Sequence, residues 1–248
     1  MEISLAAEKI AHIGGLPITN SMIMTWITGL LLILLSLLAT RRLKLIPKGI
    51  QNVFEFIVEF LFNTVDDVIG DKKQSRKYFP LLATIFIFVL FNNWLGLIPG
   101  VGTIGIHEMH EGKEVFVPIL RSGNADLNMT FALAVTTIIA VQFFGIIAIG
   151  FKKYSSKFFN FSNPIYTFVG ALELVSEISR IISFAFRLFG NIFAGEVLLT
   201  VIAMIIPYVI PLPFMGLELF VGAIQALVFT MLALVFIKMA VTAHEEAH

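Results

Sequence analysis

Three long stretches without a charged residue constrain the fold of this chain more than any other feature. Residues 21–40, 79–98 and 127–151 contain no Asp, Glu, Lys or Arg. A helix needs about 20 apolar residues to cross about 30 Å of hydrocarbon, and inside lipid the backbone must satisfy its own hydrogen bonds. The apolar residues are continuous, unlike the alternating pattern of strands in a membrane barrel. We therefore predict transmembrane helices over 21–40, 79–98 and 126–151.

The composition agrees with a membrane protein. Apolar residues make up 58% of the 248 residues and charged residues only 14%, whereas about 25% is typical of a soluble domain. The net charge of zero gives no bias toward nucleic acid, and the lack of cysteine excludes disulfides and thiolate metal ligands. The N-terminus has neither the cationic start of a signal peptide nor the Arg-rich pattern of a transit peptide, so we expect no cleaved leader.

The chain between the first two spans indicates an amphipathic helix. Residues 48–70 are too charged to span, and their polar side chains recur every three or four positions, opposite an apolar face. The polar positions are Asn52, Glu55, Glu59, Asn63 and Asp66, and the apolar ones are Phe54, Ile57, Val58, Leu61, Val65 and Val68. Such a helix suits the plane of the membrane interface, where we place it. The alternative is a helix packed on the protein's own spans.

The distribution of Lys and Arg predicts the orientation. Residues 41–77 hold eight of these cations and residues 152–157 hold three, whereas the loop 99–125 holds only two. Cytoplasmic loops are enriched in Lys and Arg. We therefore predict that the segment 1–20 and the loop 99–125 lie outside and that the C-terminus is cytoplasmic.

The last apolar region differs from the three spans. Residues 158–237 contain six charged residues, and the Pro-rich segment 207–213 divides the region into two helical arms. The first arm, 164–206, would be roughly 60 Å long as a helix, twice the thickness of the hydrocarbon. Strong tilt accommodates such a mismatch. We predict a near-horizontal helical hairpin of 164–206 and 214–243, and the fold class is then an all-α polytopic membrane protein.

Ionisable residues at membrane depth are costly and are therefore candidates for function. On the first arm they follow the helical repeat. One stripe contains Glu173, Glu177, Arg180, Arg187 and Asn191, with Ser183 one turn before the second arginine. Glu196 lies two and a half turns after Arg187 and points to the opposite side. Two polar tracks therefore meet near Arg187.

An arginine between two polar tracks is suited to act as a gate. It remains protonated at physiological pH, so it repels cations and attracts a carboxylate but does not relay a proton. A carboxyl in a dry site, in contrast, picks up and releases one. The alternative is a structural salt bridge from Arg187 to Glu177 or Glu196. On the second arm, Glu218 and Gln225 share a face and would return beside Glu196, with a plain helix–helix hydrogen bond as the alternative for Gln225.

Several short motifs agree in order and spacing with one protein family. They are Asn92-Asn-Trp-Leu-Gly-Leu-Ile-Pro99, Ala125-Asp-Leu-Asn-Met-Thr130, Leu172-Glu173-Leu-Val-Ser-Glu177, Arg187-Leu-Phe-Gly-Asn191, Ala194-Gly-Glu196 and Gln225-Ala226. Together they resemble subunit a of F-type ATP synthases. The resemblance covers the chain from Phe54 onward. The earlier residues are similar to the family only in their general character and share no motif with it.

The resemblance implies a role for each candidate residue. In that family the arginine that matches Arg187 faces a rotating c-ring and separates an outer from an inner aqueous half-channel. The matching positions are Glu196, Glu218 and Asn191 in the outer half-channel, Ser183 and Glu173 toward the inner one, and Gln225 near the arginine. Glu177 joins them through its place on the stripe. Many members have histidine where Glu218 stands and proline where Ile181 stands, so this chain departs from the family at both positions.

By the same resemblance, the chain is a non-catalytic, ion-conducting stator subunit that couples proton flow to ATP synthesis, without a cofactor. The expected partners are the c-ring, the b subunits of the peripheral stalk and membrane lipid. The short N-terminus without a targeting peptide favours a bacterial plasma membrane, with an organelle-encoded copy as the alternative. The sequence leaves H⁺ against Na⁺ open. His107 and His110 are one residue too close for zinc-protease spacing, so we expect a hydrated outer loop and no metal site.

Two other classes of protein compete with this interpretation. A secondary transporter would bind its substrate at the hairpin, but such proteins are built from repeats, and the sequence holds no second copy of the arginine hairpin. A structural membrane anchor would need no buried charges. Both are weaker hypotheses than the stator subunit.

Overall fold

The computed structural model contains five helices that are long and apolar enough to cross a membrane. It describes residues 7–13, 15–41, 49–102, 104–110, 113–158, 163–206 and 210–242. The five helices are α1 (Asn20–Thr40), α3 (Lys72–Leu95), α4 (Leu127–Ile149), α6 (Pro164–Ile205) and α7 (Pro211–Thr242). The predicted class of all-α polytopic membrane protein is confirmed.

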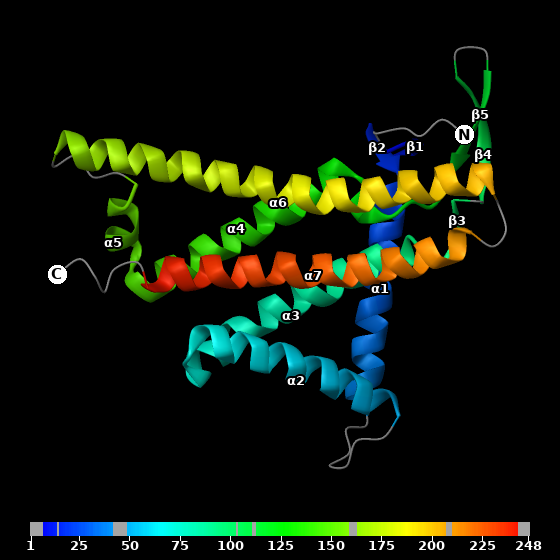
Figure 1. Ribbon diagram of the computed structural model, residues 1–248. Helices are drawn as coiled ribbons and strands as arrows, with labels where there is room; N and C mark the ends of the chain where they lie inside the picture. The colour runs from blue at the N-terminus through cyan, green and yellow to red at the C-terminus, as the bar shows by residue number, and fades with distance from the viewer. Residues whose placement is uncertain are drawn as a thin grey trace.

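The long hairpin is the dominant feature of the architecture. Helix α6 has 42 residues, about 63 Å at about 1.5 Å per residue. It packs against α7, and Figure 1 shows the two running side by side and crosswise to α1. Helices α3 and α4 support the hairpin, because α3 packs on α7 and α4 packs on both arms. The expected long, tilted hairpin is therefore present, and α7 begins at Pro211 rather than at 214.

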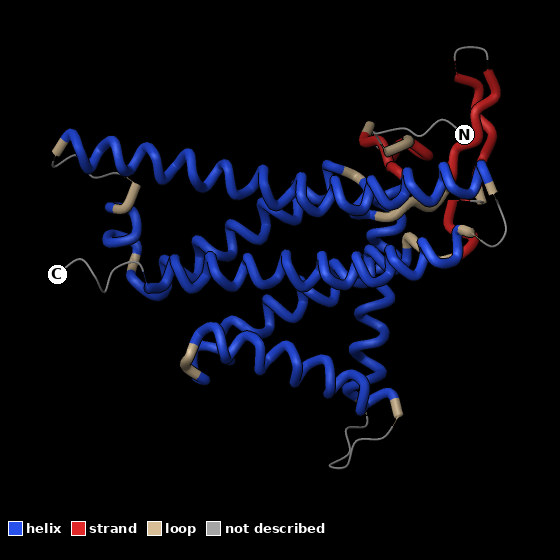
Figure 2. The backbone as a smooth tube through the Cα atoms, viewed as in Figure 1, coloured by secondary structure: helices blue, strands red, loops and turns tan. Residues whose placement is uncertain are grey.

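Short strands gather at one end of the molecule, shown in red in Figure 2. Strands β1 (Lys9–Ile13) and β2 (Leu16–Thr19) form one antiparallel hairpin, and β4 (Gly105–His110) and β5 (Lys113–Pro118) form another. Strand β3 (Pro99–Gly102) precedes the second hairpin. None of these strands was predicted from the sequence, and a loop was expected over 99–125. The side chains of His107 and His110 on β4 lie outside the described part of the structure, as does the predicted hairpin end at 243.

Helix α2 (Ile50–Ile69) packs on the protein's own helices along part of its apolar face. Leu61 and Val65 are buried in the core that α2 shares with α3 and α7. Phe56 and Phe60 remain exposed, at 70% and 49%. The alternative for this segment therefore holds around Leu61 and Val65, and the exposed Phe56 and Phe60 leave an apolar surface elsewhere on the helix. Whether that surface meets the membrane interface stays a prediction.

The second span begins earlier than predicted. Helix α3 starts at Lys72 rather than near Phe79, because Asp71 caps it by accepting a hydrogen bond from the Lys73 amide at 2.9 Å. The first turns of α3 contain charged residues, so a prediction that looks for a continuous apolar stretch places the start too late. Pro80 lies inside the helix and interrupts its backbone hydrogen bonding without ending it.

Side-chain N–H groups at the end of α3 fix the position of α7. Asn93 Nδ2 donates to the Gly222 carbonyl, and Trp94 Nε1 donates to the Leu219 carbonyl, both at 2.9 Å. Asn93 Oδ1 in turn accepts from Asn124 Nδ2 at 2.7 Å. Buried polar groups of this kind are costly unless paired, so they select one register between the helices. The register matters because Glu218 precedes Leu219 directly.

Candidate functional site

The first charges on α6 neutralise one another. Glu173 accepts from Lys157 Nζ at 2.6 Å, and Arg180 Nη2 lies 3.8 Å from the same carboxylate. Arg180 also donates from Nη1 to Glu177 Oε1, and its guanidinium lies over the ring of Phe236. All four charged side chains are partly buried. They form a cluster in which positive and negative charges balance.

Arg187 stands apart from this cluster. Its side chain is exposed, and within the described residues its one polar contact is a 3.5 Å hydrogen bond from Nη2 to Ser183 Oγ. Glu177 pairs with Arg180, and Glu196 pairs with Arg121. The structural salt bridge considered as the alternative for Arg187 is therefore not formed within the described chain.

A cavity of about 560 Å³, termed here the large cavity, lies between the second half of α6 and the start of α7. Glu196 lines it from α6, Glu218 lines it from α7, and Glu8 and Arg121 contribute from the N-terminal segment and the segment after β5. The hairpin thus brings Glu218 to the same cavity as Glu196, the arrangement expected from a fold of the two arms. The role of these residues in ion transfer stays a prediction.

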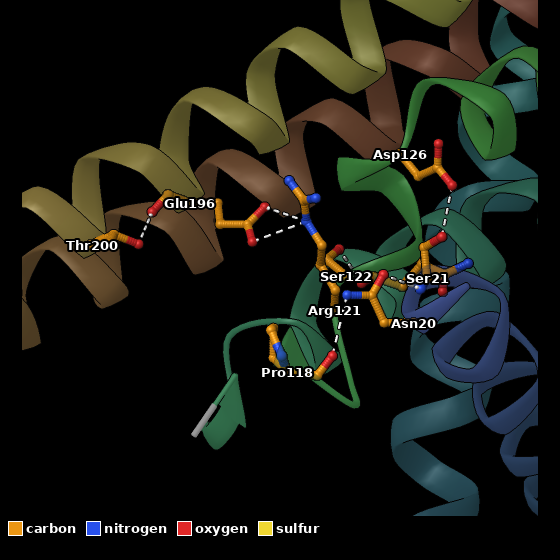
Figure 3. A network of polar contacts seen from close by, with 9 residues as sticks. Asn20, Ser21, Pro118, Arg121, Ser122, Asp126, Glu196 and Thr200 are labelled. Carbon is orange, nitrogen blue, oxygen red and sulfur yellow. Dashed lines mark hydrogen bonds and ion pairs between the residues drawn. The ribbon is translucent and has the colours of Figure 1, made fainter. Parts of the chain in front are cut away.

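Glu196 is held by an arginine that the sequence analysis did not single out. Arg121 Nε donates to both carboxylate oxygens of Glu196, at 3.1 and 3.2 Å, as Figure 3 shows. The arginine is only 6% exposed, whereas the glutamate side chain is 36% exposed. One sequence signal pointed to it: Arg121 is one of only two cations in a loop otherwise poor in them. Glu8 was missed as well, and nothing in its sequence context marks it.

Glu218 is in a different environment, although it lines the same cavity. It is 8% exposed, and it forms no hydrogen bond or ion pair with any residue that the structure describes. Its carboxylate packs directly on Gly195 of α6, where an added Cβ would lie 2.1 Å from Oε2. Glycine at 195 is therefore what allows Glu218 to approach α6.

A second cavity of about 250 Å³, termed here the small cavity, lies on the other side of Arg187 along α6. Its polar lining is Ser176, Ser179, Arg180, Ser183 and Arg187, and α7 closes it with Leu232 and Phe236. On α6 the small cavity spans positions 176–187 and the large cavity spans 192–204. The two cavities therefore meet consecutive stretches of one helix.

Asn191 and Gln225 lie between the two stretches. Asn191 Nδ2 donates to Gln225 Oε1 across the hairpin at 3.4 Å. Gln225 Nε2 is buried and has no partner among the described residues. The helix–helix hydrogen bond considered for Gln225 is thus formed, and half of the amide remains for another partner.

Tyr154 lies beside the cluster of charges at the start of α6. It sits on α5 (Phe151–Ser156), outside the membrane-spanning helices, and its hydroxyl donates to Gln142 Oε1. Burial, and secondarily the negative charges of Glu177 and Glu173, raise the pKa of Tyr154 to about 12, against a smaller opposing effect of Arg180. The phenol is therefore neutral at physiological pH.

This shift predicts a pH dependence of stability. The folded chain holds the Tyr154 proton more tightly than an unfolded chain with a pKa of 10.0, so the contribution to stability is complete below pH 10 and is lost as the pH rises toward 12. In Tyr154→Phe the loss of stability over this interval should be smaller than in the wild type. Thermal unfolding across the interval checks it, with the exposed Tyr166→Phe as control. Equal losses in all three proteins would contradict the prediction.

Comparisons with known proteins agree with the motifs and with the fold. The model of the family described as ATP synthase A chain matches residues 22–238. A protein of Moorella thermoacetica named ATP synthase subunit a is 38% identical over 236 residues, which cover 95% of this chain and 97% of the relative. Proteins of the same name from Gloeobacter violaceus and Campylobacter jejuni are 37% and 35% identical, over 92% and 90% of this chain and 86% and 89% of the relatives. With most of its length matched, this chain belongs to the ATP synthase subunit a family.

Proposed function

We propose that this chain is the ion-conducting stator subunit of a rotary ATP synthase. In this proposal two offset aqueous half-channels, separated by Arg187, let protons load and unload the carboxylates of a rotating c-ring. One observation carries the proposal: an exposed guanidinium on α6, with no ion pair among the described residues, lies at the end of the small cavity and is followed along the helix by the large cavity with Glu196 and Glu218. The subunit itself catalyses no covalent step and needs no cofactor in this scheme.

The chemistry of arginine explains how two half-channels that do not connect could still transfer protons across the membrane. A guanidinium does not release its proton, so Arg187 is a barrier to a free proton rather than a relay. It attracts a carboxylate, however, and a ring carboxylate brought to it is favoured in its ionised form. A proton can then pass only by leaving one cavity on a ring carboxyl and reaching the other cavity after rotation. Transport and rotation are coupled by this requirement.

The surface around Arg187 supports a ring of helices as the partner. Ile182 and Phe186 are exposed beside the arginine, at 45% and 53%. Gly190 has no atom within 4 Å of the position of a Cβ, and Ala194 is exposed. Small residues permit close approach of another helix within a membrane. An apolar surface with one unpaired cation fits helices that each carry one acid.

The orientation assigns the cavities to the two sides of the membrane. The large cavity lies at the end where β3 and β5 contribute to its walls. The distribution of Lys and Arg places this end outside and the C-terminus in the cytoplasm, so the large cavity is the outer half-channel and the small cavity the inner one. The membrane is the bacterial plasma membrane, the ion is H⁺ with Na⁺ as the competing candidate, and the b subunits of the peripheral stalk are further partners.

Single cysteines test the two half-channels. The chain contains no cysteine, so each variant carries one thiol. Thr200→Cys places it in the large cavity and Ser179→Cys in the small one. With a small, charged, membrane-impermeant thiol reagent, Thr200→Cys should react from the outside and Ser179→Cys from the cytoplasmic side. Labelling of this chain is measured in right-side-out and inside-out vesicles.

Ile147→Cys is the matched control. Ile147 is 50% exposed on α4 and lines neither cavity, so its thiol should face lipid and react from neither side. If Thr200→Cys and Ser179→Cys both reacted from the same side, or if neither reacted, the cavities would not be half-channels on opposite sides. The proposal of a gate between them would then be wrong.

A further inference from the structure

We propose that Arg121 is a positioning residue that divides the work between the two carboxylates of the large cavity. Arg121 holds Glu196 as a fixed negative charge and leaves Glu218 as the group that exchanges protons with the cavity. The inference rests on the proposed function, because it concerns proton transfer in the outer half-channel. The family resemblance assigns both glutamates to that half-channel without distinguishing them.

The geometry of the Arg121–Glu196 pair favours a permanent ion pair. One N–H reaches both carboxylate oxygens, at 3.1 and 3.2 Å, and arginine remains charged in any protein environment. The guanidinium is the buried partner and also lies 5.9 Å from the centre of the Phe193 ring, one turn before Glu196 on α6. The buried guanidinium therefore binds the Glu196 carboxylate on the side that faces the protein interior.

The segment that carries Arg121 is held in place before any ion arrives. The neighbouring Ser122 hydroxyl donates to the Asn92 carbonyl at 3.1 Å. Its Cβ also fills the space beside Gly96, where an added Cβ would lie only 2.5 Å away. Figure 3 shows this segment lying between α6 and the start of α1, where Asn20 Nδ2 donates to the Pro118 carbonyl at 3.2 Å. Arg121 thus projects toward Glu196 from anchored backbone.

Glu218 has the features of the exchanging group. It faces the same cavity, yet no cation that the structure describes is bonded to it. Among the described residues, the charged groups that line the large cavity with Glu196 are Arg121 after β5, Glu218 on α7 and Glu8 before β1. Of the two hairpin glutamates that line the large cavity, Glu196 is therefore neutralised by an arginine, while Glu218 stays available for a proton. A carboxyl in a confined site with no cation can take up and release a proton.

The test uses four variants of this chain in the intact ATP synthase, in inside-out vesicles. They are Arg121→Gln, Glu196→Gln, the double variant Arg121→Gln/Glu196→Gln, and Glu218→Gln. Arg121→Gln strips Glu196 of its cation, so ATP-driven proton pumping should fall at least about tenfold and its pH profile should change shape. The double variant removes both charges together, so it should recover pumping at least about threefold over Arg121→Gln and restore the pH profile. Glu218→Gln should lose pumping at least about tenfold.

Two controls and two contradicting outcomes make the result decisive. Retention of the subunit in the purified complex shows that each variant assembles, and pumping is expressed per assembled complex. Wild-type pumping in Arg121→Gln would overturn the inference, and so would a double variant that pumps no better than Arg121→Gln. Arg187→Ala is measured in parallel and distinguishes failure of the proposed function from failure of the role of Arg121. Normal pumping in Arg187→Ala would contradict the proposed function itself.

Discussion

Replacing Arg187 with alanine is expected to abolish proton-driven ATP synthesis, by at least about 100-fold, while the complex still assembles. The expectation follows from the isolation of this guanidinium, which is exposed and bonded only to Ser183 within the described chain. Its removal breaks no ion pair among the residues that the structure describes, so the fold should persist. It removes the one fixed positive charge between the two cavities, and ring carboxyls could then pass without releasing their protons. ATP synthesis by vesicles under an imposed proton gradient measures the effect.

The matched control for Arg187→Ala is Lys152→Ala. It also removes one exposed positive charge, but from α5, away from both cavities. Synthesis in this control should stay near the wild-type rate. Sustained synthesis in Arg187→Ala, at equal amounts of assembled complex, would refute the role of a gate.

Gly195→Ala is expected to lower proton pumping by at least about tenfold. The new Cβ would lie 2.1 Å from Glu218 Oε2 and 2.6 Å from Oε1, far inside van der Waals contact. Either the carboxylate leaves its place or the two arms of the hairpin separate. Both changes displace a carboxyl of the large cavity. ATP-driven pumping in vesicles measures the loss.

A second substitution can make room for the added methyl group. Glu218→Asp shortens the acid, so Gly195→Ala/Glu218→Asp should pump better than Gly195→Ala alone. Gly216→Ala is the control on the same arm, because a Cβ there meets nothing within 4 Å. If Gly195→Ala pumped like Gly216→Ala, the close packing of Glu218 on α6 would have no functional importance.

The features that follow from local pattern could be predicted from the sequence. Helix α6 was expected because its apolar length exceeds the membrane, and the stripe of Glu173, Glu177 and Arg180 follows from helical periodicity. Periodicity tells which side chains share a face, but it does not tell which of them pair. The partner of Glu196 is 75 positions away at Arg121, and no local pattern connects two residues so distant.

The remaining misses have physical reasons too. The strands of the outer loop are short and pair with their immediate neighbours, so they carry no apolar run of the kind that marks a span. The start of α3 at Lys72 depends on the cap by Asp71 and on water-facing turns rather than on hydrophobicity. The pairing of Asn93 with the Gly222 carbonyl depends on backbone geometry that a sequence does not display.

The continuity of α6 has a mechanical consequence. One unbroken helix of 42 residues carries both cavity walls and the guanidinium between them. If the proposed function holds, a sideways load applied at Arg187 by a turning ring would be borne by this single helix, which forms part of the wall of both cavities. Helices α4 and α7 both pack against that helix. In the proposed stator, resistance to torque would then come from the packing of α6 on these two helices.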